Sequence, residues 1–271
     1  MSKQHETRLV RTDDADWRWQ PEALDDYISG NYLHLAPEDQ YVGAVAISAL
    51  ATIARQRNLL HALPFGTHIS AGAVPRGSAT IEPLILPTEQ GGYIDVSDLE
   101  ESTTNATRHT MSQLALGDLG LWTPHQEDFA AIHPLWEGSF QAAGKLAEGH
   151  VHMQDMRLLT PGTHHIIAVE HGPESATAVE DEYQEFIRII CNALLPGGIL
   201  YMAYMRGSEG YEIGGVTKPA FPVTVDYVSE TLHSNNMHVF ANAGTDPSNT
   251  IRTDGDEHAY TGLGAVVAIH N

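Results

Sequence analysis

The stretch that most constrains the fold of this chain runs from residue 165 to residue 204. It opens with a short apolar run, residues 165–169, that breaks at an acidic segment containing glycine and proline, which predicts a buried strand ending in a loop. Residues 182–195 then carry apolar side chains at helical spacing. Pro196-Gly197-Gly198 are expected to stop this helix and turn the chain sharply into a second strand, residues 199–204. Strand, helix and strand in this order predict a βαβ crossover, and therefore an α/β fold with parallel strands.

The rest of the chain shows no internal repeat and no low-complexity linker. We therefore expect a polar, loose arm over residues 1–16 and a single domain over residues 17–271. The 271 residues include 14 Lys and Arg against 35 Asp and Glu, a formal net charge of −21. Such a surface repels phosphate backbones and anionic membranes, so neither nucleic acid nor a membrane is expected as a partner. Solubility alone is the simpler role for this charge.

Cysteine and histidine give little sign of a metal or a disulfide. Cys191 is the single cysteine, which excludes an internal disulfide and a cysteine-rich metal site. His150 and His152 are two residues apart on a predicted strand and would face one side of it, but no third ligand lies at a convincing spacing, so no metal is expected. The first residues are polar without an apolar signal segment, and no apolar run approaches membrane-spanning length, so a cytoplasmic location is expected.

The strand, the acidic loop, the helix and Leu194-Leu195-Pro196-Gly197-Gly198 together resemble the second half of a class I S-adenosylmethionine-dependent methyltransferase. The segment RGSEGYEIGG, residues 206–215, followed by Phe221-Pro222-Val223, is similar to the small-molecule methyltransferases grouped with the nicotinamide and phenylethanolamine N-methyltransferases. Bacterial members of that group often serve in secondary metabolism. The resemblance implies a Rossmann-like fold: a mostly parallel seven-stranded sheet with a terminal antiparallel hairpin and helices on both faces. It also implies S-adenosylmethionine as cofactor and a small molecule as methyl acceptor.

In the first half of the chain, the resemblance places the cofactor loop at Ser70, Ala71 and Gly72, after a predicted first strand. The family pattern there is acid-x-Gly-x-Gly, because glycines let the backbone approach the cofactor. This chain departs from it, since Ser70 stands at the acid position and Val74 at the second glycine. Asp98 ends the second predicted strand and matches the acid that binds the ribose hydroxyls, for which a carboxylate at the carboxyl edge of a strand is suited.

The resemblance also implies the other cofactor contacts. Leu99 would pack on the adenine, and Thr103 stands where the family tends to have an asparagine. Asp155 and Met156 follow a predicted third strand, residues 150–155, and match residues that contact the adenine. The remaining expected cofactor residues are Glu170 at the methionine end and Tyr27 and Tyr32, which would close over the site.

The acceptor side is expected at His171, Glu174, Glu209 and Tyr211. His171 follows the fourth predicted strand, and an imidazole is a suitable general base because its ordinary pKa lies near neutrality. A carboxylate in the same loop, Glu174, is able to hold an amine acceptor or to steady the sulfonium charge. Glu209 and Tyr211 match family positions that face the acceptor, where a carboxylate and a phenol orient an amine or a hydroxyl. Residues 206–215 are expected to form a mobile loop because of their glycines and serine.

Two other functions remain open. The altered loop between Ser70 and Val74 suits a changed pose of the cofactor's amino-acid end, as in an enzyme that cyclises the aminobutyrate chain of S-adenosylmethionine and releases methylthioadenosine. The missing acid and glycine also favour a cofactor-free binding protein on the same scaffold. Neither the acceptor nor the oligomeric state follows from the sequence.

Overall fold

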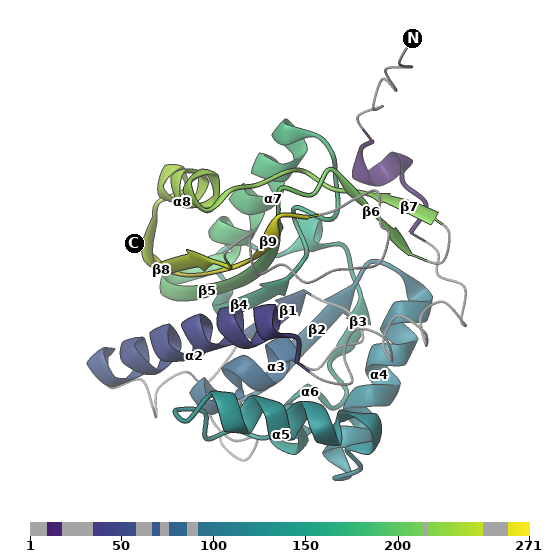
Figure 1. Ribbon diagram of the computed structural model, residues 1–271, viewed down its shortest axis with the longest axis vertical. Helices are drawn as coiled ribbons and strands as arrows, with labels where there is room; N and C mark the ends of the chain where they lie inside the picture. The colour runs from purple at the N-terminus through teal and green to yellow at the C-terminus, as the bar shows by residue number, and fades with distance from the viewer. Residues whose placement is uncertain are drawn as a thin grey trace.

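The computed structural model describes residues 10–17, 35–57, 67–70, 76–85, 92–213, 216–245 and 260–271. Its centre is a sheet of seven strands in the order β3-β2-β1-β4-β5-β9-β8 (Figure 1). The strands of this sheet are β1 Thr67–Ser70, β2 Ile94–Asp98, β3 Val151–Met153, β4 His164–Glu170, β5 Leu194–Arg206, β8 Met237–Gly244 and β9 Gly262–His270.

The sheet is mixed. Strands β3, β2, β1, β4 and β5 run parallel, whereas β9 is antiparallel to both of its neighbours, β5 and β8. From β1 the chain moves outward to β2 and β3, and it then returns to the other side of β1 to form β4. The gap between the carboxyl ends of β1 and β4 is therefore the topological switch point of the sheet, the place where α/β folds bind ligands.

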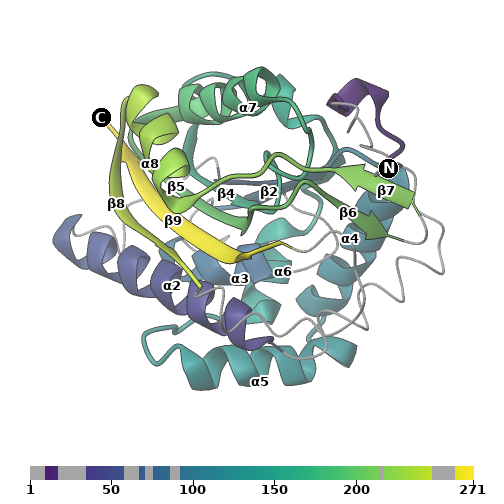
Figure 2. The ribbon, with the colours of Figure 1, turned by 45° about the horizontal axis from the view of Figure 1, so that its top comes forward.

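Helices cover both faces of the sheet (Figure 2). On one face lie α2 Pro37–Arg57, α3 Arg76–Ile81, α4 Glu101–Ala115, α5 Thr123–Ile132 and α6 Phe140–Ala147, and on the other lie α7 Glu180–Ala193 and α8 Val225–Ser234. Each layer of helices packs on its own cluster of buried apolar side chains, so the sheet separates two cores.

Strand β4 shows why its sequence is apolar throughout. Ile166 and Ala168 belong to the core under α2, whereas Ile167 and Val169 belong to the core under α7. Successive side chains of a strand point to opposite faces, and a central strand covered on both faces needs apolar residues at every position. The predicted strand, helix and parallel strand over residues 165–204 are confirmed.

The Pro-Gly-Gly segment has a different role from the one predicted. Helix α7 ends at Ala193, and β5 begins at the next residue, before the proline. Residues 196–198 lie within β5 at a bulge, where the register with β4 shifts. Gly197 has a φ of 78°, a conformation that glycine adopts at little cost. The prediction that these residues end the helix is wrong, because pairing with β4 already extends the chain at Leu194.

Residues 206–215, expected to form a mobile loop, are partly regular. Strands β6 Gly210–Ile213 and β7 Val216–Pro219 pair as an antiparallel hairpin outside the main sheet. Lys218 on β7 is buried: its ammonium group donates to the carbonyl oxygen of Asp16 and lies 5.7 Å from the ring centroid of Trp17. The hairpin is therefore attached to the N-terminal segment, in contrast to the mobile loop that was expected.

The segment before Trp17 also differs from the expected loose arm. Thr12–Asp14 form a short 3₁₀ helix, and the amide of Thr12 donates to Glu182 Oε2 at 3.0 Å. The amide of Ala178 donates to the carbonyl oxygen of Val10 at 2.9 Å. Residues 10–16 are thus bound to the start of α7 and the loop before it, and only residues 1–9 lie outside the described part of the arm.

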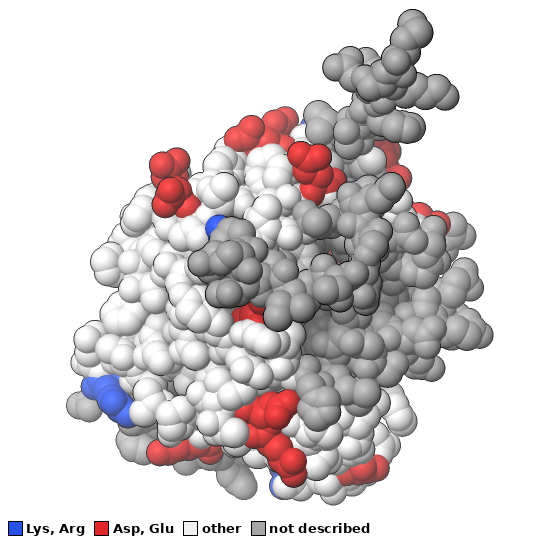
Figure 3. Space-filling view, in the orientation of Figure 1, with Lys and Arg blue, Asp and Glu red and all other residues white. Residues whose placement is uncertain are grey.

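Charge is distributed unevenly over the surface. On the face shown in Figure 3, acidic side chains form several separate patches, and basic side chains are few. Within the described ranges, no helix has both the length and the apolar character needed to cross a membrane.

Candidate functional site

A buried group of charged side chains lies at the switch point between β1 and β4. Glu170 ends β4, and Arg76 begins α3, the helix that follows β1. Arg76 Nε lies 3.3 Å from Glu170 Oε1, and Arg76 Nη1 lies 2.6 Å from Asp39 Oδ1 on α2. The hydroxyl of Tyr201 on β5 donates to the same oxygen of Glu170 at 3.1 Å. Side chains from α2, α3 and β5 therefore gather around the carboxylate that ends β4.

The electrostatics of this group explain its composition. Burying a carboxylate is costly unless a cation and hydrogen bonds compensate for lost water, and the side chains of Glu170 and Arg76 are almost fully buried. Arg76 forms ion pairs with both Glu170 and Asp39. Burial and the neighbouring charge of Glu170 raise the pKa of Tyr201 well above its ordinary value, so its hydroxyl keeps the proton that it donates. Glu170 is consequently fixed from two sides.

The loop after β4 places His171 beside this group. His171 has a φ of 52°, in the left-handed region that non-glycine residues seldom adopt. Its amide donates to the carbonyl oxygen of Ala203 at 2.8 Å, and its carbonyl oxygen accepts from the hydroxyl of Ser175. Its ring lies between two charged groups, with Nε2 3.5 Å from Arg76 Nη2 and Nδ1 3.8 Å from Glu174 Oε1. Backbone strain of this kind often marks a functional position.

Glu174 is the second buried carboxylate of the loop, with 1% of its surface exposed. Its Oε1 accepts from the amide of Met205 at 2.9 Å, while Oε2 has no hydrogen-bond partner among the described residues. The hydroxyl of Tyr183 is likewise buried and unpartnered there, and burial raises the pKa of Tyr183 well above its ordinary value. A buried carboxylate oxygen without a partner is costly, and it is the kind of atom that a bound ligand satisfies.

The hairpin β6–β7 reaches this loop through Tyr211. The hydroxyl of Tyr211 donates to the carbonyl oxygen of Ser175 at 3.2 Å. Three of the predicted acceptor-side residues, His171, Glu174 and Tyr211, thus lie on one loop or touch it. Glu209, the fourth, is exposed in the turn before β6.

The carboxyl end of β2 carries Asp98, as the sequence predicted. Asp98 Oδ1 accepts from the amide of Glu100 at 3.0 Å. The side chain of Leu99 is exposed, and so is that of Met153, which stands opposite Asp98 on β3. Thr103 is buried in the first turn of α4, where its hydroxyl donates to Glu100 Oε2 at 3.2 Å. A carboxylate and an apolar surface are therefore adjacent at the tips of β2 and β3.

Asp155, beyond the end of β3, is engaged by a neighbouring cation. Its Oδ1 accepts from the amide of Arg157 at 2.8 Å, and its Oδ2 accepts from Arg157 Nε at 2.8 Å. Arg157 also bonds Asp13 at 2.7 Å, and these hydrogen bonds raise the pKa of the guanidinium. Met156 begins the 3₁₀ helix Met156–Leu158. An amine bound at Asp155 would share the carboxylate with Arg157.

Several predicted site residues lie outside the described residues: Tyr27, Tyr32, Ala71 and Gly72. Of Ser70 the structure describes the backbone, which stands opposite Ser97 on β2 and Val169 on β4.

Arg76, Asp39 and Tyr201 were not among the predicted site residues. A signal existed for Arg76, because a glutamate at the end of a buried strand requires a cation, and Arg76 is the first cation after β1. The positions of Asp39 and Tyr201 depend on how α2 and β5 pack, which no local pattern gives.

A shallow groove of about 470 Å³ lies elsewhere, between α2 and β8. Its lining is Tyr41, Ala44, Val45, Ser48, Ala49, Thr52, Phe240 and Ala241. Since it has no acidic or basic side chain and lies against the opposite edge of the sheet from β3, it is separate from the strand tips.

Comparison with known proteins adds similar structures but no sequence family. No protein-family model matches the sequence, and no curated protein matches it. One similar solved structure is an S-adenosylmethionine-dependent methyltransferase from Clostridium acetobutylicum, with 8% identity over 83% of this chain and 92% of that chain, at a TM-score of 0.48. Another, from Aquifex aeolicus, is a SAM-dependent methyltransferase with 11% identity over 94% and 100% of the two chains, at a TM-score of 0.46.

A third similar structure is the 1,6-didemethyltoxoflavin-N1-methyltransferase of Burkholderia thailandensis, solved with 1,6-didemethyltoxoflavin and S-adenosylhomocysteine. It has 12% identity over 94% of this chain and 92% of that chain, at a TM-score of 0.41. Identities and TM-scores this low decide nothing about the activity or the substrate of the present chain.

Proposed function

We propose that this protein is an S-adenosylmethionine-dependent methyltransferase acting on a small molecule. One observation carries the proposal: the carboxylates of Asp98 and Glu170 end β2 and β4, strands that flank β1 at the topological switch point. Ligands of α/β sheets bind outside the carboxyl ends of the strands at such a point. The sheet order, with five parallel strands followed by an antiparallel pair, also agrees with the fold that the sequence resemblance implies.

The cofactor side of the proposed site follows the strand tips from β3 to β4. Asp98 would accept hydrogen bonds from the two ribose hydroxyls, and the exposed side chains of Leu99 and Met153 would offer an apolar surface to the adenine. Asp155 would accept from the adenine amine, and Glu170 would lie at the methionine end. The other proposed cofactor contacts come from the resemblance: Met156, Thr103, Ser70, Ala71, Gly72, Tyr27 and Tyr32.

The acceptor side lies at the loop between β4 and α7. When bound, S-adenosylmethionine supplies an electrophilic methyl group, so the chain itself has to orient a nucleophile and exclude water. Glu174 Oε2, buried and without a described partner, would bind a donor group of the acceptor. His171 would accept the proton that the nucleophile loses, and Tyr211 would position the acceptor from β6. Glu209 would guide the acceptor from the exposed turn before β6.

A finer assignment rests on the segment 206–215. Its resemblance favours the small-molecule group that includes the nicotinamide and phenylethanolamine N-methyltransferases, in a biosynthetic pathway of secondary metabolism. An amine acceptor would be consistent with the buried carboxylate of Glu174.

Calorimetric titration with S-adenosylmethionine and S-adenosylhomocysteine tests the proposal. Asp98→Asn keeps an oxygen that accepts from the amide of Glu100 but removes the charge and one acceptor. Hydrogen bonds to a charged group contribute about 1.5–3 kcal/mol, so the Kd should rise by about tenfold or more. Glu230→Gln, a matched charge removal at an exposed position on α8, should leave the Kd unchanged.

The outcomes separate the candidate functions. S-adenosylhomocysteine formed only in the presence of an acceptor supports the methyltransferase. Methylthioadenosine formed from the cofactor alone would instead support the cyclising enzyme. No binding at millimolar concentration would contradict both enzymes and leave a binding protein with another ligand.

A further inference from the structure

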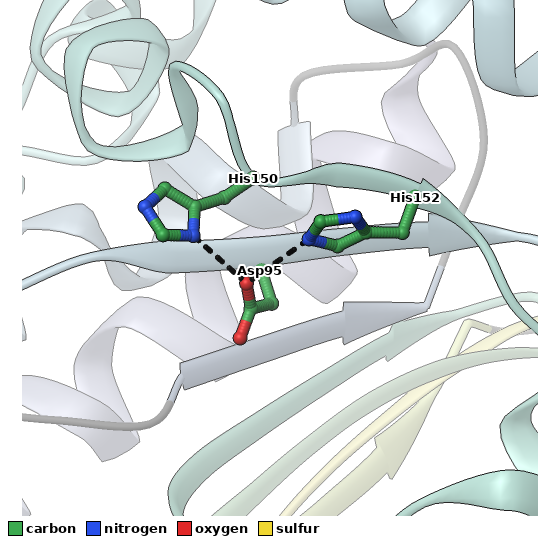
Figure 4. A group of neighbouring side chains, drawn as sticks. All are labelled: Asp95, His150 and His152. Carbon is green, nitrogen blue, oxygen red and sulfur yellow. Dashed lines mark hydrogen bonds and ion pairs between the residues drawn. The ribbon is translucent and has the colours of Figure 1, made fainter.

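A second group of polar side chains lies at the β3 edge of the sheet, away from the strand tips. Figure 4 shows Asp95 from β2 with His150 and His152 from the neighbouring chain segment. Ser97 on β2 stands opposite His152 on β3 in the parallel register, so residues 95 and 150 lie side by side two positions earlier. Because alternate residues of a strand share a face, all three side chains point to the same side of the sheet.

The three side chains converge on one point. His150 Nδ1 lies 3.1 Å from Asp95 Oδ1, and His152 Nε2 lies 3.5 Å from the same oxygen (Figure 4). The three ligating atoms all lie within 4.8 Å of one another. A single ion bound about 2.0–2.2 Å from each atom needs separations of this order, so small side-chain rotations suffice to form the site.

The surroundings leave the three side chains accessible to an ion from solvent. The side chains of His150, His152 and Asp95 are 41%, 50% and 26% exposed, so an ion has access from solvent and keeps room for water ligands. The ring of Tyr93 stacks on His150 with centroids 4.7 Å apart and planes 18° apart, which restricts the orientation of this imidazole. Groups that orient a metal-binding histidine contribute to metal affinity.

We propose that Asp95, His150 and His152 bind a divalent transition-metal ion, for which Zn²⁺ is the reference probe. Two imidazoles and one carboxylate match the ligand preference of Zn²⁺ and its neighbours, whereas Mg²⁺ and Ca²⁺ prefer oxygen ligands. Three protein ligands leave at least one coordination position for water.

The position of the site indicates a structural role. Strand β3 has three residues and lies at the edge of the sheet, next to β2. An ion held by side chains from β2 and from the β3 segment would tie this short strand to the sheet. The site lies three residues before Asp98 on β2, about 10 Å away at 3.3 Å per residue, so it is separate from the proposed cofactor site.

Zinc titration of the full chain, purified in a chelator and then dialysed, tests the proposal. We expect one tight Zn²⁺ site per chain, with the affinity reduced by at least about 100-fold in His150→Ala/His152→Ala. The control His109→Ala/His238→Ala removes two exposed imidazoles elsewhere and should keep the tight site. Co²⁺ bound to the wild type and the control should show the visible absorption of a low-coordinate ion, and the double variant should not.

A stability measurement gives a second readout. Saturating Zn²⁺ should raise the Tm of the wild type and of the control, because an ion that binds the folded state stabilises it, and should leave the Tm of the double variant unchanged. If the double variant does not fold, the nearly isosteric Asp95→Asn takes its place, with the same expected loss of the tight site. The proposal is overturned if the wild type shows no tight site, or if the folded variant binds Zn²⁺ as tightly as the control does.

Discussion

At the scale of single residues, buried polar side chains carry most of the information about this protein. Arg76 and Glu170 compensate each other at the switch point, and Glu174 keeps one oxygen unpartnered among the described residues. His133 is a further buried polar side chain. It is 2% exposed and stacks edge-on against Phe129 at a centroid distance of 4.9 Å. Burial lowers the pKa of His133 to about 4.

This histidine makes folding stability depend on pH. An unfolded imidazole titrates near pH 6.5, so between about pH 6.5 and pH 4 the unfolded chain binds a proton that the folded chain does not. The contribution of the neutral, buried His133 to the free energy of unfolding is therefore fully present above pH 6.5. It is lost as the pH falls towards 4, and the loss reaches about 2 kcal/mol at pH 5. Urea denaturation at pH 7.5 and pH 5.0 should show that His133→Leu loses about 2 kcal/mol less stability than the wild type over this interval.

His109→Leu is the control for this measurement, because His109 is exposed on α4. Its stability should follow the wild-type dependence on pH. Equal dependence in the wild type and in His133→Leu would show that His133 does not titrate as its burial requires.

At the scale of elements, helix α2 makes a close contact with the end of α5 through a glycine. A Cβ atom added at Gly43 would lie 2.8 Å from Nε2 of His133, which directly follows α5. Atoms do not approach so closely, so either the helix or the ring would have to shift. The contact gives this glycine a packing role, although glycine inside a helix costs about 1 kcal/mol relative to alanine.

The effect of Gly43→Ala should change sign with its neighbour. In the wild type the alanine should destabilise the protein by about 1–3 kcal/mol, because its methyl group would displace the buried imidazole. In a His133→Ser background the same alanine should be neutral or stabilise by up to about 1 kcal/mol through its helix propensity. Chemical denaturation of the four proteins in a double-mutant cycle measures the coupling, and an equal cost in both backgrounds would refute it.

At the scale of the whole molecule, the formal charge of −21 is the property that most affects how stability depends on salt. Acidic patches with few cations repel one another, and this repulsion destabilises the compact state at low ionic strength (Figure 3). Salt screens the repulsion, since the Debye length falls from about 20 Å to about 7 Å between roughly 20 mM and 200 mM NaCl.

We therefore expect the Tm to rise by about 2–4 °C over this range of NaCl, the shift produced by about 1 kcal/mol in a chain of this size. Differential scanning calorimetry near pH 7.5 measures it. Near the sequence pI of about 5.0 the net charge vanishes, and the same salt should change the Tm little. A Tm that does not depend on salt at pH 7.5 would show that repulsion between the acidic groups does not destabilise the folded state.

The sequence by itself determined the features that depend on neighbouring residues. Periodicity predicted the βαβ unit around α7. Asp98 was placed correctly at the end of β2, because a strand that breaks into an acidic segment has a recognisable end. These signals are local, since hydrogen bonding and side-chain direction within one element follow from its own residues.

Only the tertiary structure decided what lies between distant segments. It placed Pro196-Gly197-Gly198 in a bulge of β5 beside β4, and it attached the β6–β7 hairpin to Asp16 where a mobile loop was expected. It also brought Arg76 to Glu170 and supplied Asp95 as the third partner of His150 and His152. The Arg76–Glu170 and Asp95–His150 contacts join residues 94 and 55 positions apart, and their formation depends on strand order and register, which no short stretch of sequence encodes.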